Sequence, residues 1–403
     1  MTVVKDALMI IGAGIFQIPA IKIAKKMGLK VLVTDRDNLA PGKALADYFE
    51  LASTRDEQKN IEIAKQYAKN KLNLRGVLTI GTDFTYTVSC VAQALSLPGV
   101  PPEIALKATN KIEMRKQLKK HQVPCPDFIE VKKLTDIADF IKEKGLPVVI
   151  KPADNMGARG VRKIEKATDL KKAFETAKKN SFSETVIIEE YMEGEEVSID
   201  TLVYRGKVYP LTIADRIITF PPYFIEIGHT IPSILPQNVL DDVINVMEKG
   251  VKALGIDFSA SKGDIKITKE GAKIGEMTTR LSGGFHSQYT DPLSTGMNSI
   301  KAAIDIAIGN ELNLNDITPK YHHAAAERAL LPGFGKIKKI EGVEKAQKIK
   351  GIKKIVLNVG QGDTLYPFTS NIGKAGHVIA FGATRKEAIE QAEKAQKTIK
   401  FYF

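Results

Sequence analysis

The sequence predicts an α/β fold that becomes α+β in its central part. An apolar stretch at residues 7–11, a glycine turn and an amphipathic pattern at residues 18–27 indicate a strand–helix opening of the Rossmann type. Helical and strand patterns then mix up to about residue 150. Beyond residue 185, strand patterns succeed one another and include a hairpin around residues 265–277.

The length and composition favour an enzyme-sized chain of several units. The 403 residues are 43% hydrophobic and 26% charged, which suits two to four compact units. The two cysteines, Cys90 and Cys125, have no metal-ligand or redox spacing, and they indicate a reducing cytoplasm. We expect no signal peptide and no membrane span, because no stretch approaches the roughly 18 apolar residues that a span requires.

The net charge of +12 leaves nucleic-acid binding open as an alternative. The lysines, however, are spread along helical patterns such as those around residues 171–179 and 353–354, and there is no RNA-binding aromatic signature. We therefore favour a solvated lysine-rich surface, with anionic substrates as a second contributor, and we expect no nucleic-acid partner.

The opening strand and turn resemble a dinucleotide fingerprint that lacks one glycine. Residues 30–34 form the second strand, with Asp35 at its tip, but Gln17 stands where the third glycine belongs. NAD binding is therefore disfavoured. Further strands are expected at residues 76–80 and around Val100, and Asp83 follows the first of these either as a ligand contact or, with better reason, as a helix N-cap.

A strand that ends in a lysine marks the next unit, which begins near residue 105. Helices are expected at residues 112–121 and 135–144, and the strand at 146–152 contains Lys151. The glycine-containing loop at 153–161 follows directly. A lysine beside such a loop can cradle a polyphosphate, although a hairpin with a solvent-facing lysine is the simpler alternative.

The hairpin around residues 265–277 carries two carboxylates. If Thr268 lies opposite Ala272, Asp264 lies opposite Glu276, and Lys266 faces a hydrophobic residue. Opposed carboxylates about 5 Å apart at Cβ repel each other and are best tolerated with a cation such as Mg²⁺ between them. The alternative is an ordinary exposed hairpin with scattered charges.

The ordered set of these patterns resembles the ATP-grasp carboxylate–amine ligase superfamily over nearly the whole chain. The set comprises the glycine-rich opening, Asn110-Lys111 before a helix, the VVIKP strand with its glycine loop, VIIEEYMEGEE, and the Asp264 hairpin that ends in R-L-S-G-G. The resemblance implies ATP and Mg²⁺, with Mn²⁺ as an alternative metal. It implies phosphate contacts from Lys111 and Lys151, adenine contacts from Glu189 and the Met192 backbone, ribose contacts from Glu196, metal ligation by Asp264 and Glu276, and stabilisation of the transferred phosphoryl group by Arg280. Thr278 stands where many members have Asn as a further metal ligand.

A second stretch narrows the resemblance to L-amino-acid ligases that form dipeptides. Residues 221–232 contain an E-x-x-H pattern flanked by prolines, which favour a loop. Glu226 is suited to hold an ammonium, and His229 to hold a carboxylate or an acyl phosphate, although a simple structural role for His229 stays open. His286 is a lesser candidate for the same pocket. His377, in the last unit, is expected to be structural. A final helix is expected at residues 385–398, with Thr384 as its N-cap.

The resemblance implies a Rossmann-like unit at residues 1–105, an ATP-grasp unit at 106–318 with a lid at about 125–190, and a small C-terminal unit at 319–403. A cytoplasmic homodimer is expected. The predicted reaction joins a carboxylate and an amine, most simply two amino acids, through an acyl phosphate. Three alternatives stay open: a purine-biosynthesis or biotin-carboxylase-like enzyme that uses formate, bicarbonate or a ribonucleotide; an NAD-dependent dehydrogenase; and a non-catalytic nucleotide-binding or nucleic-acid-binding protein.

Overall fold

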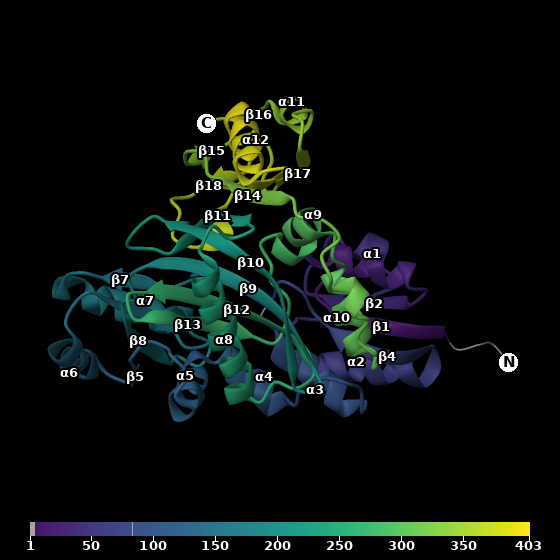
Figure 1. Ribbon diagram of the computed structural model, residues 1–403, viewed down its shortest axis with the longest axis horizontal. Helices are drawn as coiled ribbons and strands as arrows, with labels where there is room; N and C mark the ends of the chain where they lie inside the picture. Colours follow the sequence, from purple (N-terminus) through teal and green to yellow (C-terminus); the bar gives the residue numbers. More distant parts are fainter. Residues whose placement is uncertain (1–4, 83) are drawn as a thin grey trace.

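A computed structural model describes residues 5–82 and 84–403, so Asp83 lies outside the described residues. Its N-terminal unit is a parallel sheet with helices on both faces (Figure 1). The elements are β1 (Lys5–Ile11), α1 (Ile18–Lys26), β2 (Lys30–Asp35), β3 (Tyr48–Leu51), α2 (Glu57–Asn70), β4 (Leu72–Leu78) and α3 (Thr85–Ala94). The strands lie in the order β3-β2-β1-β4. Leu8 and Ile10 pack with α1, whereas Met9 and Ile11 pack with α2 on the other face. This opening confirms the predicted strand–helix–strand unit, but Val100 lies outside any strand.

A four-stranded antiparallel sheet lies in the segment that we predicted to be a lid, at the left of Figure 1, and the name lid is kept for it below. Its elements are β5 (Phe128–Val131), α6 (Leu134–Lys144), β6 (Val148–Pro152), β7 (Arg162–Ile164), α7 (Leu170–Asn180) and β8 (Val186–Glu190), and the strand order is β5-β8-β6-β7. Val148, Ile150 and Ile188 pack against α6 and α7. Because side chains alternate along a strand, Val149, Lys151 and Glu189 face the other way.

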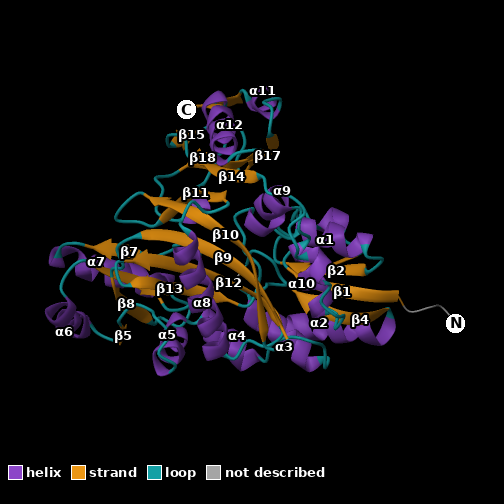
Figure 2. Ribbon diagram, in the orientation of Figure 1, coloured by secondary structure: helices purple, strands orange, loops and turns teal. Residues whose placement is uncertain are grey.

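An eight-stranded sheet runs through the middle of the molecule (Figure 2). Its strand order is β13-β12-β9-β10-β11-β14-β19-β17. The strands are β9 (Glu195–Tyr204), β10 (Lys207–Thr219), β11 (Ile225–Ile231), β12 (Ser259–Thr268), β13 (Gly271–Thr278), β14 (Ala324–Leu330), β17 (Ile352–Leu357) and β19 (Gly376–Gly382). The sheet therefore continues across residue 318, from the central strands into the C-terminal ones.

Helices cover this sheet from different parts of the chain. They are α4 (Pro102–Thr109), α5 (Lys111–Lys120), α8 (Gln237–Leu254), α9 (Asp291–Thr295) and α10 (Ser299–Ala307). The apolar side of α8, including Val243 and Met247, shares a core with Ile265 and Ile274 of the hairpin. Helix α10 contacts β12 of this sheet and also packs with α1 and β4 of the N-terminal unit.

The C-terminal strands carry one long helix and two small ribbons. The remaining elements are β15 (Gly335–Lys336), β16 (Lys339–Glu341), α11 (Val343–Gln347), β18 (Thr364–Leu365), α12 (Arg385–Thr398) and β20 (Lys400–Tyr402). Helix α12 begins as predicted, because the Thr384 hydroxyl accepts from the Glu387 amide at 3.2 Å. Of the helices in the described part of the chain, none combines the length and apolar character that crossing a bilayer requires.

The predicted opposition of Asp264 and Glu276 is confirmed, but the predicted closure of their hairpin is wrong. Thr268 pairs with Gly271 rather than with Ala272, because the turn is one residue shorter than expected. The register is thereby displaced by one residue. A bulge directly before Glu276 displaces it back, so the two carboxylates still face each other.

The bulge residue is Gly275, and it has a partner of its own. Its carbonyl oxygen accepts from Nη2 of Arg115 at 2.6 Å, so α5 is fastened to the hairpin at this point. Between the turn and the bulge the corrected register applies. Lys266 therefore lies opposite Lys273 and not opposite Ile274.

The segment with the E-x-x-H pattern is a strand and not the predicted loop. The prolines flank β11 without interrupting its pairing with β10 and β14. Along a regular strand, Glu226 and His229 would point to opposite faces. A bulge at Ile227 adds one residue between them, so both side chains reach the same cleft.

Candidate functional site

A cleft of about 580 Å³ lies among the lid, the central sheet and the C-terminal strands. Its walls come from segments that are distant in sequence. All ten residues proposed for the site from the sequence line it: Lys111, Lys151, Glu189, Met192, Glu196, Glu226, His229, Asp264, Glu276 and Arg280.

Asp264 and Glu276 lie side by side on β12 and β13. One oxygen of Asp264 accepts from Lys262 and lies 3.0 Å from Nη1 of Arg216. Glu276 lies 3.1 Å from the ammonium of Lys111. Burial acts to raise the pKa of Glu276, but Lys111 and the other nearby lysines outweigh it and lower this pKa to about 2.

Oxygen atoms beside this pair are suited to a hard cation. Within the described residues, Oδ1 of Asp264 and the hydroxyls of Ser198 and Thr278 are buried without a hydrogen-bond partner. Ser198 lies opposite Asp264 on β9, and Thr278 follows Glu276 on the same face of β13. No three Asp, Glu, His or Cys side chains of the described chain meet in metal-ligating fashion. The donor set is therefore two carboxylates with hydroxyls, which fits Mg²⁺.

Two lysines of the cleft are paired with carboxylates. The Lys111 ammonium also donates to the Asn155 carbonyl in the glycine loop at 2.7 Å. Lys151 lies 2.6 Å from Glu189, whose other oxygen accepts from Arg115 at 3.0 Å. Burial raises the pKa of Glu189, but Arg115 and Lys151 outweigh that effect and leave it lowered. Glu189 is thus a charged link between α5 and β6.

Two residues predicted to contact the adenine and the ribose, Met192 and Glu196, come after β8 in the chain. Met192 and the loop before β9 line the cleft, and Glu196 pairs with Arg216 and lies 3.7 Å from Lys266. Burial raises the pKa of Glu196 more than Arg216 lowers it.

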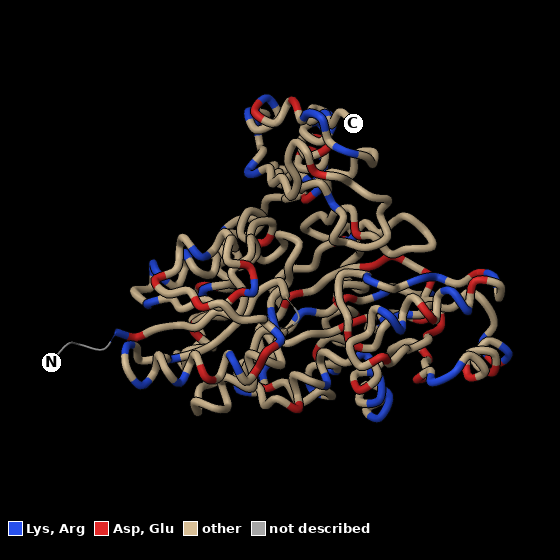
Figure 3. Tube along the Cα trace, turned by 180° about the vertical axis from the view of Figure 1, so that it is seen from behind, with Lys and Arg blue, Asp and Glu red and all other residues tan. Residues whose placement is uncertain are grey.

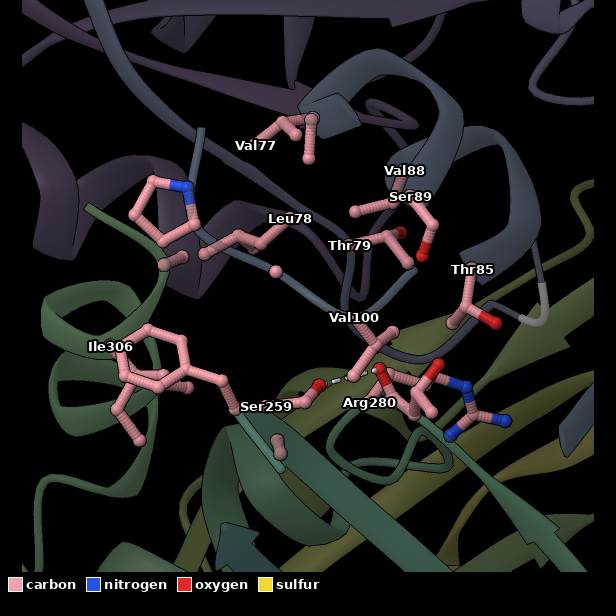
Figure 4. A pocket seen from close by; sticks show the side chains of 18 of the residues that line it. Val77, Leu78, Thr79, Thr85, Val88, Ser89, Val100, Ser259, Arg280 and Ile306 are labelled. Atoms are coloured by element: carbon pink, nitrogen blue, oxygen red, sulfur yellow. Dashed lines mark hydrogen bonds between the residues drawn. The ribbon is translucent and has the colours of Figure 1, made fainter. Parts of the chain in front are cut away.

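Arg280 lies where the central sheet meets the N-terminal unit. Its Nη1 donates to the carbonyl of Leu281 at 2.9 Å, and the residue is 9% exposed. Figure 4 shows its guanidinium at the edge of a small cavity of about 60 Å³, away from Val77 and Leu78. Arg280 lines both this cavity and the main cleft.

The glycine-rich end of the hairpin is only partly available to an anion. The amide and hydroxyl of Ser282 both donate to the Asp200 carboxylate, at 3.0 Å and 2.6 Å. Gly283 approaches the backbone of Gly81 so closely that a Cβ on Gly283 would lie 3.0 Å from the Cα of Gly81. The Ser282 amide is therefore already occupied by Asp200.

Glu226 and His229 sit in a buried polar network. Glu226 lies 3.0 Å from Nη2 of Arg216, and His229 Nδ1 lies 4.0 Å from Glu226 and 3.7 Å from Glu327. His229 Nε2 shares a hydrogen bond of 2.7 Å with Thr290. Burial lowers the pKa of His229 well below its usual value, so its imidazole is neutral at pH 7.

His286, the lesser candidate, and His377, which we expected to be structural, also reach the cleft. The ring of His286 lies 5.4 Å from that of His229, and its Nε2 shares a hydrogen bond of 2.9 Å with Thr212. His377 shares a bond of 2.7 Å between Nδ1 and Glu327. That bond accords with a structural role, which stays a prediction.

Four further charged residues were missed from the sequence: Arg115, Arg216, Glu327 and Lys374. Each acts on a predicted site residue across a sequence separation that no short pattern spans. The strand pattern of β14 was the available signal for Glu327, since it places a charge among buried neighbours.

The opening turn is not arranged for a dinucleotide. The Ala13 amide donates to Asp35 at 2.8 Å, and the Gln17 side chain lies against Gly12 and Gly14 while it donates to the Ile80 carbonyl. Gln17 thus lies beside both glycines of the turn, at the position where the dinucleotide fingerprint has its third glycine.

Comparisons with known proteins agree with this geometry. Residues 108–283 match the ATP-grasp domain, and residues 328–403 match the L-amino acid ligase C-terminal domain 2. The L-arginine-specific L-amino acid ligase of Bacillus subtilis is 26% identical over 272 residues, which is 65% of this chain and 64% of that protein. The chain thus spans slightly less than two thirds of that relative.

Solved structures share the fold along the whole chain. The L-amino acid ligase from Bacillus licheniformis superposes with a TM-score of 0.84 at 21% identity and covers 99% of this chain and 98% of that one. The phosphoribosylglycinamide synthetase from Anaerococcus prevotii gives 0.77 at 20% identity and covers 99% and 100%. The chain therefore carries an ATP-grasp domain followed by a C-terminal domain of the L-amino acid ligase type, and the predicted ATP-dependent ligase is confirmed.

Proposed function

We propose that this enzyme joins a carboxylate to an amine through an acyl phosphate, and that both substrates are amino acids. The observation that carries the proposal is the pair Asp264 and Glu276, opposed on neighbouring strands in a cleft that also holds Lys111, Lys151 and Arg280. A carboxylate does not condense with an amine in water because hydroxide leaves poorly. Phosphorylation by ATP supplies a good leaving group, and the protein then positions the reactants and neutralises charge.

In this proposal the nucleotide lies between the lid and the central sheet. Glu189 and the Met192 backbone would meet the adenine, and Glu196 would meet the ribose. Lys111 and Lys151 would hold the phosphates, exchanging part of their present pairing with carboxylates for a more highly charged partner. The glycine loop that accepts from Lys111 would close over the same phosphates.

Asp264 and Glu276 would hold Mg²⁺, or Mn²⁺, with Thr278 and Ser198 as the nearest unpaired hydroxyls. When bound, the metal neutralises charge on the ATP phosphates. Arg280 would meet the oxygens of the transferred phosphoryl group. Its position on the same side of the hairpin as Glu276 supports this role.

Glu226 and His229 would receive the amino-acid substrates. The pKa of Glu226 is lowered because Arg216 outweighs the effect of burial, so Glu226 stays anionic and can hold an ammonium. His229 is neutral, which suits it to accept a hydrogen bond or a proton from an amine better than to hold a carboxylate by charge.

A second candidate is a purine-biosynthesis reaction, because the phosphoribosylglycinamide synthetase fold matches this chain over its whole length. A panel of amino-acid pairs, formate, bicarbonate and phosphoribosylamine, followed by ADP release and product mass, would separate the two. Product from amino-acid pairs alone would support our proposal. Turnover only with a ribonucleotide or a one-carbon acid would overturn it.

The proposal extends to a homodimer in the cytoplasm. Both cysteines are free thiols, as a reducing compartment requires. In Figure 3, Lys and Arg are interspersed with Asp and Glu along the trace in this view, which favours small anionic substrates over one nucleic-acid-binding face. Light scattering and salt-dependent retention on DNA or RNA would test these points.

A further inference from the structure

Lys374 is a buried cation in the cleft to which no predicted role belongs. It follows a short turn of the C-terminal strands, lines the cleft and is 7% exposed. Within the described residues, no acceptor lies in hydrogen-bond reach of its ammonium, and no carboxylate lies within ion-pair distance. The Lys374 side chain is enclosed, but its ammonium is not among the fully buried atoms that lack a partner, so it faces the open space of the cleft. A cation held there without a protein partner is available to an anionic ligand.

The turn that carries Lys374 is held on several sides. The Asn371 side chain accepts from the Glu226 amide at 2.9 Å, and the Asn371 amide donates to the Gly157 carbonyl in the glycine loop at 3.0 Å. The Lys374 carbonyl accepts from Asn358 at 3.1 Å. The ammonium is therefore placed by β11, the lid and β17 together, as a preorganised contact requires.

The charges of this wall alternate in sign away from the metal carboxylates. Arg216 lies 3.0 Å from Asp264 and 3.0 Å from Glu226, so Glu226 stands beyond Arg216. Lys374 stands at the Glu226 end of this row, because Asn371 in the turn before it accepts from the Glu226 amide and both Lys374 and Glu226 line the cleft. The carboxylate that becomes phosphorylated must reach Asp264, Glu276 and Arg280, so a cation at the far end serves another group.

We propose that Lys374 binds the carboxylate that the amine substrate keeps, so that the enzyme selects amino acids over neutral amines as its nucleophile. This inference rests on the proposed ligase function and deepens it. A positive charge at this place also favours the neutral, nucleophilic form of the neighbouring amine over the ammonium.

The test compares each L-amino acid with its own primary amide, which keeps the amine and removes the negative charge. Calorimetric binding is measured with a non-hydrolysable ATP analogue and Mg²⁺, using the wild type and Lys374→Met. The wild type is expected to bind the acid about 10–100-fold more tightly than the amide. Lys374→Met is expected to lose that preference by weaker binding of the acid alone.

Two variants control the comparison. Lys374→Arg keeps the charge and should retain most of the preference, whereas Lys348→Met removes an exposed lysine of the same C-terminal part and should behave as wild type. Where turnover is detected, Lys374→Met should raise KM for the amine substrate with little change in kcat.

A Lys374→Met protein that keeps the preference, or that loses acid and amide binding equally, would overturn the inference, as would a wild type without any preference. If Lys374→Met weakened the binding only of amino acids with acidic side chains, acting as the substrate that is phosphorylated, the assignment of Lys374 to the amine substrate would be overturned. The ligase proposal can fail independently of this inference. If the wild type binds acids more tightly than amides but never releases ADP, Lys374 remains a carboxylate contact and ligation is refuted.

Discussion

Arg216 is the charge on which the buried carboxylates of the cleft depend. Its guanidinium contacts Glu196 and lies 3.0 Å from both Glu226 and Asp264, with a side chain that is 11% exposed. Arg216→Met would leave three buried carboxylates facing one another. Loss of one partner from a buried ion pair destabilises a protein by about 3–5 kcal/mol, because the remaining charge is left uncompensated. That is a large share of a typical stability of about 5–15 kcal/mol.

The effect should depend on pH in a definite direction. Burial raises the pKa of Glu226, but Arg216 outweighs it and lowers this pKa in the folded wild type. The stabilisation from this carboxylate is therefore present above the usual glutamate pKa of about 4.3 and is lost as the pH falls. In Arg216→Met the carboxylates take up protons more readily, so the gap to wild type should be largest near pH 7.5 and smaller near pH 5.

Urea unfolding followed by circular dichroism measures this gap. Arg205→Met is the matched control, because Arg205 lies in the turn between β9 and β10 and its ion pair with Glu311 is 70% and 89% exposed. The control should change stability by less than about 1 kcal/mol. A loss for Arg216→Met as small as that of the control, or a loss equal at both pH values, would refute the reasoning.

Other charged groups give three further tests. Arg280→Ala should lower ATP-dependent turnover by about 10²–10³-fold while the protein still folds, as measured by ADP release and circular dichroism; wild-type turnover would remove Arg280 from the chemistry. Asp264→Asn and Glu276→Gln should each weaken metal binding by about tenfold or more, measured both by Mg²⁺ titration of turnover and by Mn²⁺ binding in electron paramagnetic resonance; unchanged affinity would place the metal elsewhere. Asp291 lies on α9 with a pKa that burial raises to about 7, so its folded form keeps a proton that the unfolded chain releases from about pH 4 upward. Stability should therefore fall as pH rises through this window, and Asp291→Asn should be more stable than wild type at pH 8 but not at pH 4; equal stability at pH 8 would contradict the raised pKa.

The sequence predicted local elements better than their partners. The opening unit, the helix at 385–398 with its Thr384 cap, and the opposition of Asp264 and Glu276 all follow from patterns a few residues long. The opposition of Asp264 and Glu276 was predicted correctly although the closure of the hairpin was not. The shorter turn and the bulge displace the register in opposite directions and cancel at this pair.

The contacts around the site could not be predicted in the same way. Arg216 meets carboxylates from three other strands, and Lys374 comes from a turn almost 150 residues after Glu226. Such meetings depend on strand order in the sheet, which neither propensity nor spacing specifies. The strand β11 is a further example. Prolines on both sides of it suggested a loop, whereas the structure has a paired strand with a bulge at Ile227.

The pairing of β11 with β14 sets a condition for engineering this enzyme. Four residue pairs join these strands, and Gly228 lies so close to the opposite backbone that a Cβ would fall 2.4 Å from the Glu327 carbonyl oxygen. A chimera that grafts the terminal module of another ligase must therefore supply a strand of matching register. Without it, β11 would become an open edge prone to aggregation, and Glu226 and His229 would lose their support together.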